Sequence, residues 1–233
     1  MSEMKEKIVV LTGAGISAES GIKTFRDAGG LWEGHDVMEV ASPQGWNKNR
    51  ELVLDFYNQR RRQLKEVEPN EAHHALVELE SRYDVSIITQ NVDDLHSRAG
   101  SSKIIHPHGE LRKVRSTGVE SLVYDWTEDC VIGDKCERGF QLRPHIVWFG
   151  EAVPAMETAV QEVFQANHIL IVGTSMQVYP AAGLVGYAPT DASIYYVDPN
   201  PSINYELQQR SGLEVFANPA TIGVRELVDR LLL

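Results

Sequence analysis

Two glycines near the N-terminus have the spacing of a turn that binds phosphate. Gly13, Ala14 and Gly15 follow the apolar run 8–11, and residues 13–18 fit the pattern Gly-x-Gly-x-x-Ala. Glycines in such a turn let backbone N–H groups approach a pyrophosphate at the N-terminus of the next helix. Glycine turns between a strand and a helix are also often purely structural, so this motif alone only indicates a dinucleotide site.

A dehydrogenase would need a further acidic residue after this turn. That residue lies about 20 positions after the glycines, at the end of a second strand, where it binds ribose. Asp36 has roughly that spacing, but it follows residues 32–35 (Trp-Glu-Gly-His), which are not typical of a strand end. The sequence therefore disfavours a hydride-transfer enzyme.

Five ordered motifs carry a closer resemblance. They occupy residues 21–32, 89–96, 106–111, 144–151 and 173–181, and they include Thr-Phe-Arg, Gln-Asn-Val-Asp, His-Pro-His-Gly, Val-Trp-Phe-Gly-Glu and Gly-Thr-Ser, respectively. Together they closely resemble the sirtuin family of NAD-dependent protein deacylases, from about residue 8 to the C-terminus. The resemblance implies a Rossmann-like domain and a small lobe, with NAD and an acyl-lysine meeting in the cleft between them.

The resemblance also implies which residues bind NAD. Arg26 adds charge-assisted hydrogen bonds to phosphate, and Phe25 shields the anomeric carbon from water after nicotinamide leaves. Asp93 accepts a hydrogen bond from the nicotinamide carboxamide. The expected set is Gly13, Ala14, Gly15, Thr24, Phe25, Arg26 and Trp32 around the phosphates and ribose, Gln90, Asn91 and Asp93 at the nicotinamide, and Gly173, Thr174, Ser175, Asp198, Pro199, Asn200 and Ala220 at the adenosine.

His108 is the expected general base, and the resemblance places Asn91 beside it among the catalytic residues. In this chemistry the substrate's amide oxygen attacks the ribose as nicotinamide leaves, and the ribose 2′-hydroxyl then attacks the resulting imidate. A histidine titrates in the right range to take the hydroxyl proton, which typically contributes about 10²–10⁴-fold. The family places the base immediately before a glycine, which selects His108 over His106. We expect structural roles for His73, His74, His96, His106 and His145.

Tyr57 and Arg60 are three residues apart in a predicted helix over 49–65, so they share one helix face. This pair resembles the Tyr-x-x-Arg signature of sirtuins of the bacterial class III type, which remove succinyl, malonyl and acetyl groups. Arg60 would pair with a distal carboxylate while Tyr57 donates its hydroxyl. The alternative is that residues 60–62 form a solvated basic face. We expect desuccinylation to exceed deacetylation, with 2′-O-acyl-ADP-ribose and nicotinamide as products.

The segment 147–151 is expected to hold the substrate polypeptide. The resemblance implies that it pairs as a strand with an extended peptide, through main-chain contacts that tolerate many sequences. Its residues are Val147, Trp148, Phe149, Gly150 and Glu151. The expected partners are therefore acylated-lysine proteins or peptides.

The chain departs from the family at the structural zinc. Most sirtuins bind it with two Cys-x-x-Cys pairs, but residues 116–119 are Ser-Thr-Gly-Val where the first pair should lie. Cys130 and Cys136 are the only cysteines, and no histidine lies between residues 109 and 144. We expect no zinc, and a lobe held by apolar packing. The candidate packing residues are Leu122, Val123, Tyr124, Trp126, Val131, Ile132 and Phe140.

The elements that position these motifs follow an α/β pattern. Near-continuous apolar runs are typical of a parallel sheet covered on both faces, with ligands at the carboxyl ends of its strands. We predict strands at 8–11, 85–88, 146–149, 169–172 and 194–197, and helices at 49–65, 72–81, 154–166 and 224–233. The whole chain, 1–233, is predicted to form one catalytic domain. Its large Rossmann-like lobe would comprise 1–27, 76–111 and 143–233, and its small lobe a strandless, mostly helical part at 28–75 and a polar part at 112–142.

Composition excludes several other classes of protein. The 233 residues carry a formal net charge of −11, which disfavours binding to nucleic acid or to an anionic membrane. The sequence contains no run of about 18 apolar residues, so it predicts no membrane span. The N-terminus lacks the features of a signal peptide and cysteines are few, so we expect a cytoplasmic location. The oligomeric state is not determined by these features.

Two other functions would use the same cofactor. One is a mono-ADP-ribosyltransferase, which passes ADP-ribose to protein, and the other is a non-catalytic NAD-binding module. Asn91, Asp93 and His108 are all present, which disfavours the second.

Overall fold

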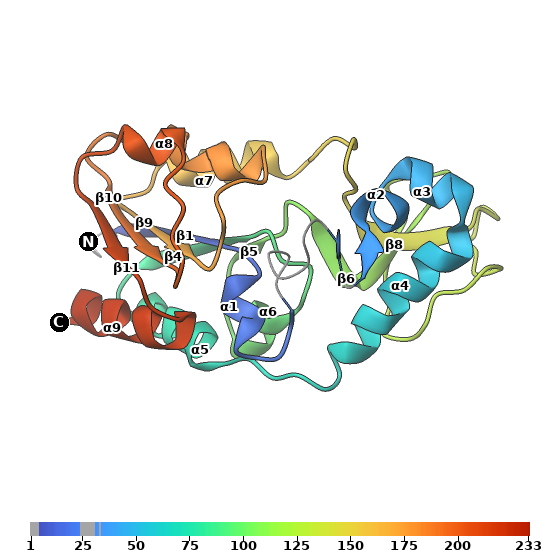
Figure 1. Ribbon diagram of the computed structural model, residues 1–233, viewed down its shortest axis with the longest axis horizontal. Helices are drawn as coiled ribbons and strands as arrows, with labels where there is room; N and C mark the ends of the chain where they lie inside the picture. Colours follow the sequence, from blue (N-terminus) through green and yellow to red (C-terminus); the bar gives the residue numbers. More distant parts are fainter. Residues whose placement is uncertain (1–4, 24–30, 33) are drawn as a thin grey trace.

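The computed structural model describes residues 5–23, 31–32 and 34–233, except for the side chains of residues 31 and 32. It has two lobes (Figure 1). The large lobe is built on one sheet whose hydrogen-bonded neighbours are all parallel. In order, its strands are β11 (Leu213–Phe216), β10 (Ser193–Val197), β9 (His168–Val172), β1 (Lys7–Thr12), β4 (Asp84–Thr89) and β5 (Ile104–Ile105). The predicted Rossmann-like α/β class is confirmed.

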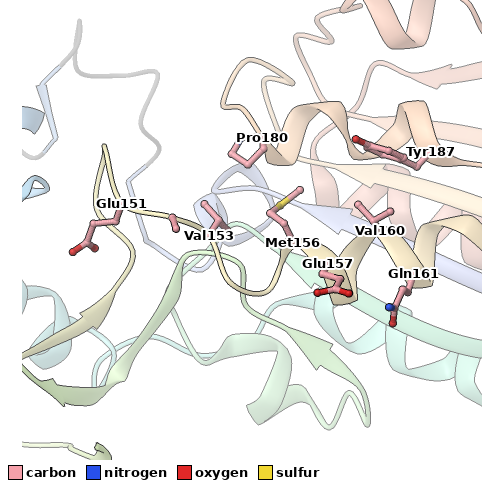
Figure 2. A pocket seen from close by; sticks show the side chains of 9 residues that line it. Glu151, Val153, Met156, Glu157, Val160, Gln161, Pro180 and Tyr187 are labelled. Atoms are coloured by element: carbon pink, nitrogen blue, oxygen red, sulfur yellow. The ribbon is translucent and has the colours of Figure 1, made fainter. Parts of the chain in front are cut away.

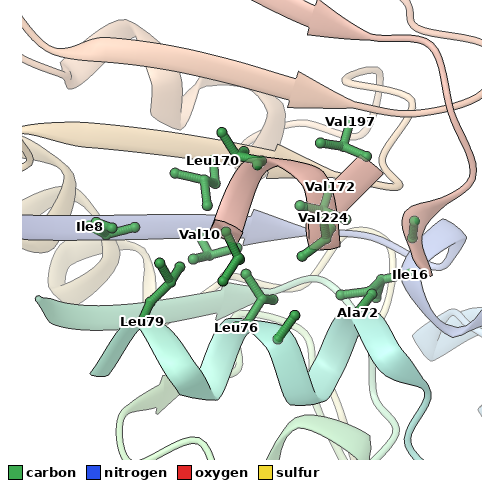
Figure 3. Close-up of a cluster of buried hydrophobic side chains, with 14 of the residues drawn as sticks. Ile8, Val10, Ile16, Ala72, Leu76, Leu79, Leu170, Val172, Val197 and Val224 are labelled. Carbon is green, nitrogen blue, oxygen red and sulfur yellow. The ribbon is translucent and has the colours of Figure 1, made fainter. Parts of the chain in front are cut away.

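Alternate residues of the central strands enter two separate cores. Ile8 and Val10 pack with α5 (Glu71–Glu78) and α9 (Ala220–Leu232) on one face of the sheet, as Figure 3 shows. Val9 and Leu11 pack with α7 (Met156–Phe164) and the 3-10 helix η3 (Ala181–Tyr187) on the other face. Burial of both faces explains why β1 is apolar along almost its whole length.

The small lobe contains an antiparallel sheet in the order β7 (Val123–Asp125), β6 (Gly109–Ser116) and β8 (Leu142–Ile146). It also contains α2 (Val37–Val40), α3 (Pro43–Lys48) and α4 (Arg50–Gln63), and α4 contacts both β6 and β8. Asn49 begins α4 because its side chain accepts from the Leu52 amide. The short helices α1 (Gly15–Ala18) and α6 (Leu95–Ala99) lie between the two sheets (Figure 1).

Several expected boundaries differ in the structure. The strand predicted at 146–149 is wrong, because Ile146 ends β8 in the small sheet and residues 147–149 form no strand. The expected strandless stretch 28–75 contains the two-residue strands β2 (Leu31–Trp32) and β3 (His35–Asp36). Residues 71–75 were expected in the small lobe, but α5 packs against the large sheet, so they belong to the large lobe. Residues 109–111 and 143–146 were expected in the large lobe, but they lie in β6 and β8 of the small sheet. Helix α9 begins at Ala220, before the predicted start at 224.

The packing predicted for the small lobe is only partly correct. Leu122, Tyr124 and Trp126 pack against its core. The exposed fractions of Val131, Ile132 and Phe140 are 52%, 51% and 46%, and Val123 is also exposed, so these four do not form the core. The two cysteines, Cys130 and Cys136, are buried there instead. No helix in the described part of the chain is long and apolar enough to cross a membrane.

Candidate active site

The turns that follow β1 and β9 touch each other through glycines. A Cβ on Gly15 would lie 2.6 Å from the Cα of Gly173, and a Cβ on Gly13 would lie 2.8 Å from the Gly173 carbonyl oxygen. The amides of Gly13 and Gly15 donate to the carbonyls of Val172 (3.1 Å) and Gly173 (2.8 Å). These two N–H groups therefore donate to carbonyls of the protein, whereas we had expected them to donate to a pyrophosphate. No acceptor among the described residues takes the Ala14 amide hydrogen.

A buried polar cluster lies beside this turn. The Ser17 hydroxyl donates to Asp93 Oδ2 (3.0 Å), and Asn91 Nδ2 donates to Ser17 Oγ (3.2 Å) and to the Gly13 carbonyl (3.1 Å). Burial raises the pKa of Asp93 to about 6, although hydrogen bonds from the Leu95 amide and from Ser17 oppose the shift. At neutral pH the carboxylate is mainly ionised and can accept a hydrogen bond from an amide.

Ser17 was missing from the residues expected in the site. It is fully buried and joins the Asn91 amide to the Asp93 carboxylate. Its position in the Gly-x-Gly-x-x-Ala motif could have indicated this role. The motif forms the first turn of α1, and the parallel pairing of β1 with β4 places that turn against the end of β4.

His108 is held in the tautomer that a general base requires. Its Nδ1 lies 3.1 Å from the Gln90 carbonyl oxygen, which can only accept, so Nδ1 carries the hydrogen and Nε2 keeps its lone pair. Burial lowers the pKa of His108, and the bond to Gln90 opposes this shift. A Cβ on Gly109, whose φ is +83°, would lie 2.0 Å from the His145 carbonyl oxygen, which explains the glycine after the base. The His108 carbonyl accepts from the Val147 amide (3.0 Å).

Two other histidines, His73 and His96, are buried and fit the expected structural roles, and His106 is partly buried. His96 Nε2 lies 3.0 Å from Thr12 Oγ1, and the rings of His73 and His96 are 4.9 Å apart. Burial lowers the pKa of His73 to about 4 and lowers the pKa of His96 well below its usual value. Burial also lowers the pKa of His106, and a backbone hydrogen bond with Asn91 opposes that shift, so the choice of His108 over His106 stays a prediction from its place before Gly109.

The ends of β9 and β10 lie side by side where the adenosine is expected. Thr174 Oγ1 accepts from Gln90 Nε2 (3.0 Å), and the Thr174 carbonyl accepts from the Tyr196 hydroxyl (2.7 Å). Asp198 Oδ1 accepts from the Asn200 amide (2.8 Å). Ala220 is buried at the start of α9, Ser175 is partly buried, and Pro199 and Asn200 are exposed. The residues expected to bind NAD thus lie, where the structure describes them, along one edge of the large sheet.

Four of the expected NAD residues cannot be placed in full. Thr24, Phe25 and Arg26 lie outside the described residues. Only the backbone of Trp32 is described, in β2.

Tyr57 and Arg60 are buried within the small lobe. Tyr57 is fully buried, and its oxygen accepts from the indole N–H of Trp148 (3.1 Å). Burial raises the pKa of Tyr57 far above its usual value, so the hydroxyl stays protonated. The Arg60 guanidinium lies 3.4 Å from the centroid of the Phe56 ring, and its Nη1 donates to the Phe56 carbonyl (2.7 Å). The pair is therefore desolvated, as a specific carboxylate site requires.

The alternative of a solvated basic face is wrong for two of the three arginines. Arg60 is 9% exposed and Arg61 is fully buried. Arg61 donates to the Leu111 carbonyl (2.9 Å) and to Asn58 Oδ1 (2.6 Å), which ties α4 to β6. Arg62 is about half exposed and pairs with Asp129.

The segment expected to pair with substrate forms a turn in this structure. Four of its amides already have acceptors within the protein. The Val147 amide donates to the His108 carbonyl, and the Trp148 amide donates to the Glu151 carboxylate. The Phe149 amide donates to the Ala41 carbonyl, and the Glu151 amide donates to the Trp148 carbonyl. All four donor–acceptor distances are 2.8–3.0 Å. Among the five residues, Phe149 is exposed and Gly150 has a φ of +89°, whereas Trp148 is 2% exposed. Strand pairing along the whole segment therefore does not fit this arrangement.

A groove continues from this turn along the large lobe. Its volume is 590 Å³, and it runs from Glu151 between α7 and η3 (Figure 2). Its lining is mainly apolar with two carboxylates, and it consists of Glu151, Ala152, Val153, Met156, Glu157, Val160, Gln161, Pro180 and Tyr187.

The region expected to hold zinc in the family has a different chemistry here. Cys136 Sγ lies 3.2 Å from Ser116 Oγ, and Cys130 Sγ points to the Leu142 carbonyl at 3.8 Å. Burial raises the pKa of Cys130 to about 12, which disfavours a thiolate. In the described ranges, no group of three or more His, Cys, Asp or Glu side chains is arranged to hold a metal ion. These residues do not fit a four-cysteine zinc site.

The parallel sheet gathers Asn91, Asp93 and His108 at its carboxyl edge, and a small antiparallel lobe lies beside it. This arrangement defines an α/β enzyme that handles a dinucleotide. The sequence matches the Sir2 family over residues 13–180, and the chain belongs to this family. A Helicobacter pylori protein named NAD-dependent protein deacylase is 59% identical over 227 residues, which cover 97% of this chain and 98% of that protein. A solved Sir2 homologue mutant in complex with ADP-ribose superposes with a TM-score of 0.88 at 37% identity, covering 98% of this chain and 92% of that one. A Sir2 homologue in complex with NAD gives a TM-score of 0.86 at 37% identity, with 98% and 90% coverage.

Proposed function

We propose that this protein removes succinyl and malonyl groups from lysine side chains, with NAD as the co-substrate, and removes acetyl groups more slowly. That it is an NAD-dependent protein deacylase follows from its family and from relatives of that name. The preference for acidic acyl groups goes beyond what the family and these names establish. One observation carries it: adjacent residues hold the expected base and Tyr57, because the Val147 amide donates to the His108 carbonyl and the Trp148 indole donates to the Tyr57 oxygen.

The NAD site supplies its own polar groups along the sheet edge. The Ala14 amide, which has no acceptor among the described residues, is placed to donate to phosphate, and the Asp93 carboxylate can accept from the nicotinamide carboxamide. Asp198 lies at the end of β10, where a ribose or adenine would meet it. The Ser17 hydroxyl holds Asn91 and Asp93 in one arrangement, so these side chains are ordered before NAD binds.

His108 acts on the ribose after nicotinamide has left. Its Nε2 takes the proton of the 2′-hydroxyl, directly or through the 3′-hydroxyl, while Nδ1 keeps its hydrogen on the Gln90 carbonyl. The lowered pKa keeps the imidazole neutral at pH 7, which is the form that accepts a proton. The attack of the 2′-oxygen on the imidate carbon breaks the bond from that carbon to the lysine nitrogen, and the lysine leaves as an amine. Water then opens the acyl group that bridges the two ribose oxygens, so the products are lysine, nicotinamide and 2′-O-acyl-ADP-ribose.

The acidic end of the acyl chain binds in the small lobe. Arg60 supplies positive charge and Tyr57 supplies a hydroxyl hydrogen, both in a buried setting where charge-assisted bonds are stronger than in water. An acetyl group has no carboxylate to use them. The substrate polypeptide enters along the groove that begins at Glu151, with the apolar lining taking side chains near the acyl-lysine (Figure 2). The small lobe keeps this arrangement without zinc.

A panel of acetyl, malonyl and succinyl forms of one lysine peptide, assayed with NAD, tests the proposal. In the Arg60→Met variant we expect kcat/KM for the succinyl peptide to fall about 10- to 100-fold, the loss of a charged hydrogen-bonded contact, with little change for the acetyl peptide. Arg62→Met is the matched control on the same helix, because Arg62 is half exposed and pairs with Asp129. Equal losses on both peptides in Arg60→Met would contradict the preference.

A second measurement separates deacylation from the transfer of ADP-ribose to protein. Labelled NAD is incubated with an acylated protein, and we expect the label to leave with the acyl group as a small molecule. Label retained on the protein would identify a mono-ADP-ribosyltransferase. Metal analysis of the purified, untagged protein tests the zinc-free lobe, and stoichiometric zinc would contradict it.

A further inference from the structure

The Trp148 side chain is fixed on several sides, although it belongs to a segment expected to contact substrate through its backbone. Its indole is 2% exposed. The Arg143 guanidinium lies 3.2 Å from the centroid of the Trp148 ring, and the Trp46 ring lies 5.7 Å away, tilted by 40°. The side chain is therefore part of the small-lobe core and does not present a surface to substrate.

Arg143 and Glu151 form a clamp around this tryptophan. Two nitrogens of Arg143 bind the two oxygens of Glu151, at 2.6 Å and 3.1 Å. Glu151 Oε2 also accepts from the Trp148 amide (2.8 Å) and from Arg115 (3.0 Å). Paired carboxylate and guanidinium groups in a partly buried site are geometrically specific, so the clamp allows the indole little freedom to rotate.

The one polar atom of the indole is directed at Tyr57. Trp148 Nε1 can only donate, and it donates to the Tyr57 oxygen over 3.1 Å. In this bond the hydroxyl is the acceptor, so its own hydrogen has to point in another direction. The indole bond therefore restricts the directions in which the Tyr57 hydroxyl can donate its hydrogen.

We propose that Trp148 is a positioning residue for acyl selectivity: by donating to the Tyr57 oxygen, it directs the Tyr57 hydroxyl hydrogen toward the distal carboxylate of a succinyl or malonyl group. This inference rests on the proposed function, in which Tyr57 and Arg60 receive that carboxylate. It goes beyond the proposed function because it assigns part of the selectivity between acyl groups to Trp148, in the turn after β8 that the Arg143–Glu151 pair also holds.

The test compares succinyl and acetyl peptides in Trp148→Phe, which keeps an aromatic ring and removes the N–H group. We expect the ratio of succinyl to acetyl kcat/KM to fall about fivefold, the effect of one neutral hydrogen bond, through a higher KM for the succinyl peptide. Loss of packing alone would affect both peptides equally. Equal effects on the two peptides would therefore overturn the inference.

A double-mutant cycle shows whether Trp148 acts through Tyr57. In a Tyr57→Phe background there is no hydroxyl to position, so Trp148→Phe should have no further effect on the ratio of succinyl to acetyl kcat/KM. A further loss of selectivity in that background would overturn the inference. If Trp148→Phe does not fold, 3-benzothienylalanine at position 148 keeps the two-ring shape and replaces N–H with sulfur, and the same change in ratio is expected.

The outcomes also separate this inference from the proposed function. If the wild-type enzyme prefers the succinyl peptide and Arg60→Met removes the preference, but removal of the indole N–H does not change it, only the role of Trp148 is overturned. If the wild type has no preference for an acidic acyl group, both are overturned.

Discussion

The proposed NAD end and the proposed acyl end of the site are held by different kinds of contact. At the NAD end, the carboxyl ends of adjacent parallel strands bring Gly13, Asn91 and Gly173 together, and the sheet topology alone makes them neighbours. At the acyl end, Tyr57 and Trp148 are 91 residues apart and meet through one side-chain hydrogen bond between a helix and the turn after β8. The first end is set by the backbone, and the second depends on individual side chains.

This difference teaches which substitutions should affect which property. Changes at the sheet edge alter a step that all acyl groups share, so they should lower every activity together. Changes around α4 and the turn after β8 should alter the ratio between acyl groups, as expected for Arg60→Met. The predictions below test whether the two ends separate in this way.

The largest effect is expected for His108→Tyr. It removes the proposed base for the ribose hydroxyl proton, so kcat should fall by about 10²–10⁴-fold or more for the acetyl and succinyl peptides alike. NAD binding, measured by calorimetry, should survive, because the residues proposed to bind NAD are others. A loss confined to one acyl group would show that the two ends are not separate.

Acid should destabilise the large lobe through its buried histidines. The pKa of His73 in the folded state is lowered to about 4 by burial, so above about pH 6.5 the ring is neutral in both states and its contribution to stability is complete. As pH falls from 6.5 toward 4 the unfolded chain binds a proton that the folded chain does not, which should cost on the order of 2–3 kcal/mol. His96, whose pKa burial lowers well below its usual value, adds to this loss.

Urea unfolding at pH 7.5, 6 and 5 measures the effect. His73→Gln should have a shallower loss of unfolding free energy with acid than the wild type. His74→Gln is the matched control, because His74 is exposed on the same helix. The same slope in all three proteins would contradict the assignment.

A smaller effect is expected for Ser17→Ala, which removes the hydroxyl between Asn91 and Asp93. We expect KM for NAD to rise about 5- to 10-fold, the effect of one or two lost hydrogen bonds, with the ratio of succinyl to acetyl activity unchanged. Steady-state kinetics with varied NAD checks this. A changed acyl ratio would mean that the two ends are coupled.

The large lobe could be predicted because its signals are local in the sequence. Apolar runs such as 169–172 end directly at polar residues, and parallel pairing then places those ends together. The strand β11 was missed because it lies at the edge of the sheet, where Glu214 and Val215 are exposed and interrupt the apolar pattern.

The small lobe was harder to predict because its side chains override the local pattern. Residues 146–149 are apolar, but Glu151 accepts the Trp148 amide hydrogen and bends the chain into a turn. Val131, Ile132 and Phe140 are apolar and exposed, because the three-stranded sheet is too small to cover them and the buried cysteines already occupy the core. The indole bond to Tyr57 has no sequence signal, since only the folded chain brings the two residues together.

The position of β1 in the middle of the sheet has a consequence for synthesis on the ribosome. β1 can pair with β4 once residue 89 has emerged, but its other edge waits for β9, which ends at Val172. At about 5–20 residues per second, an apolar strand edge stays unpaired for several seconds in the growing chain. During that interval the nascent protein depends on chaperones or on its own compact intermediates to avoid aggregation.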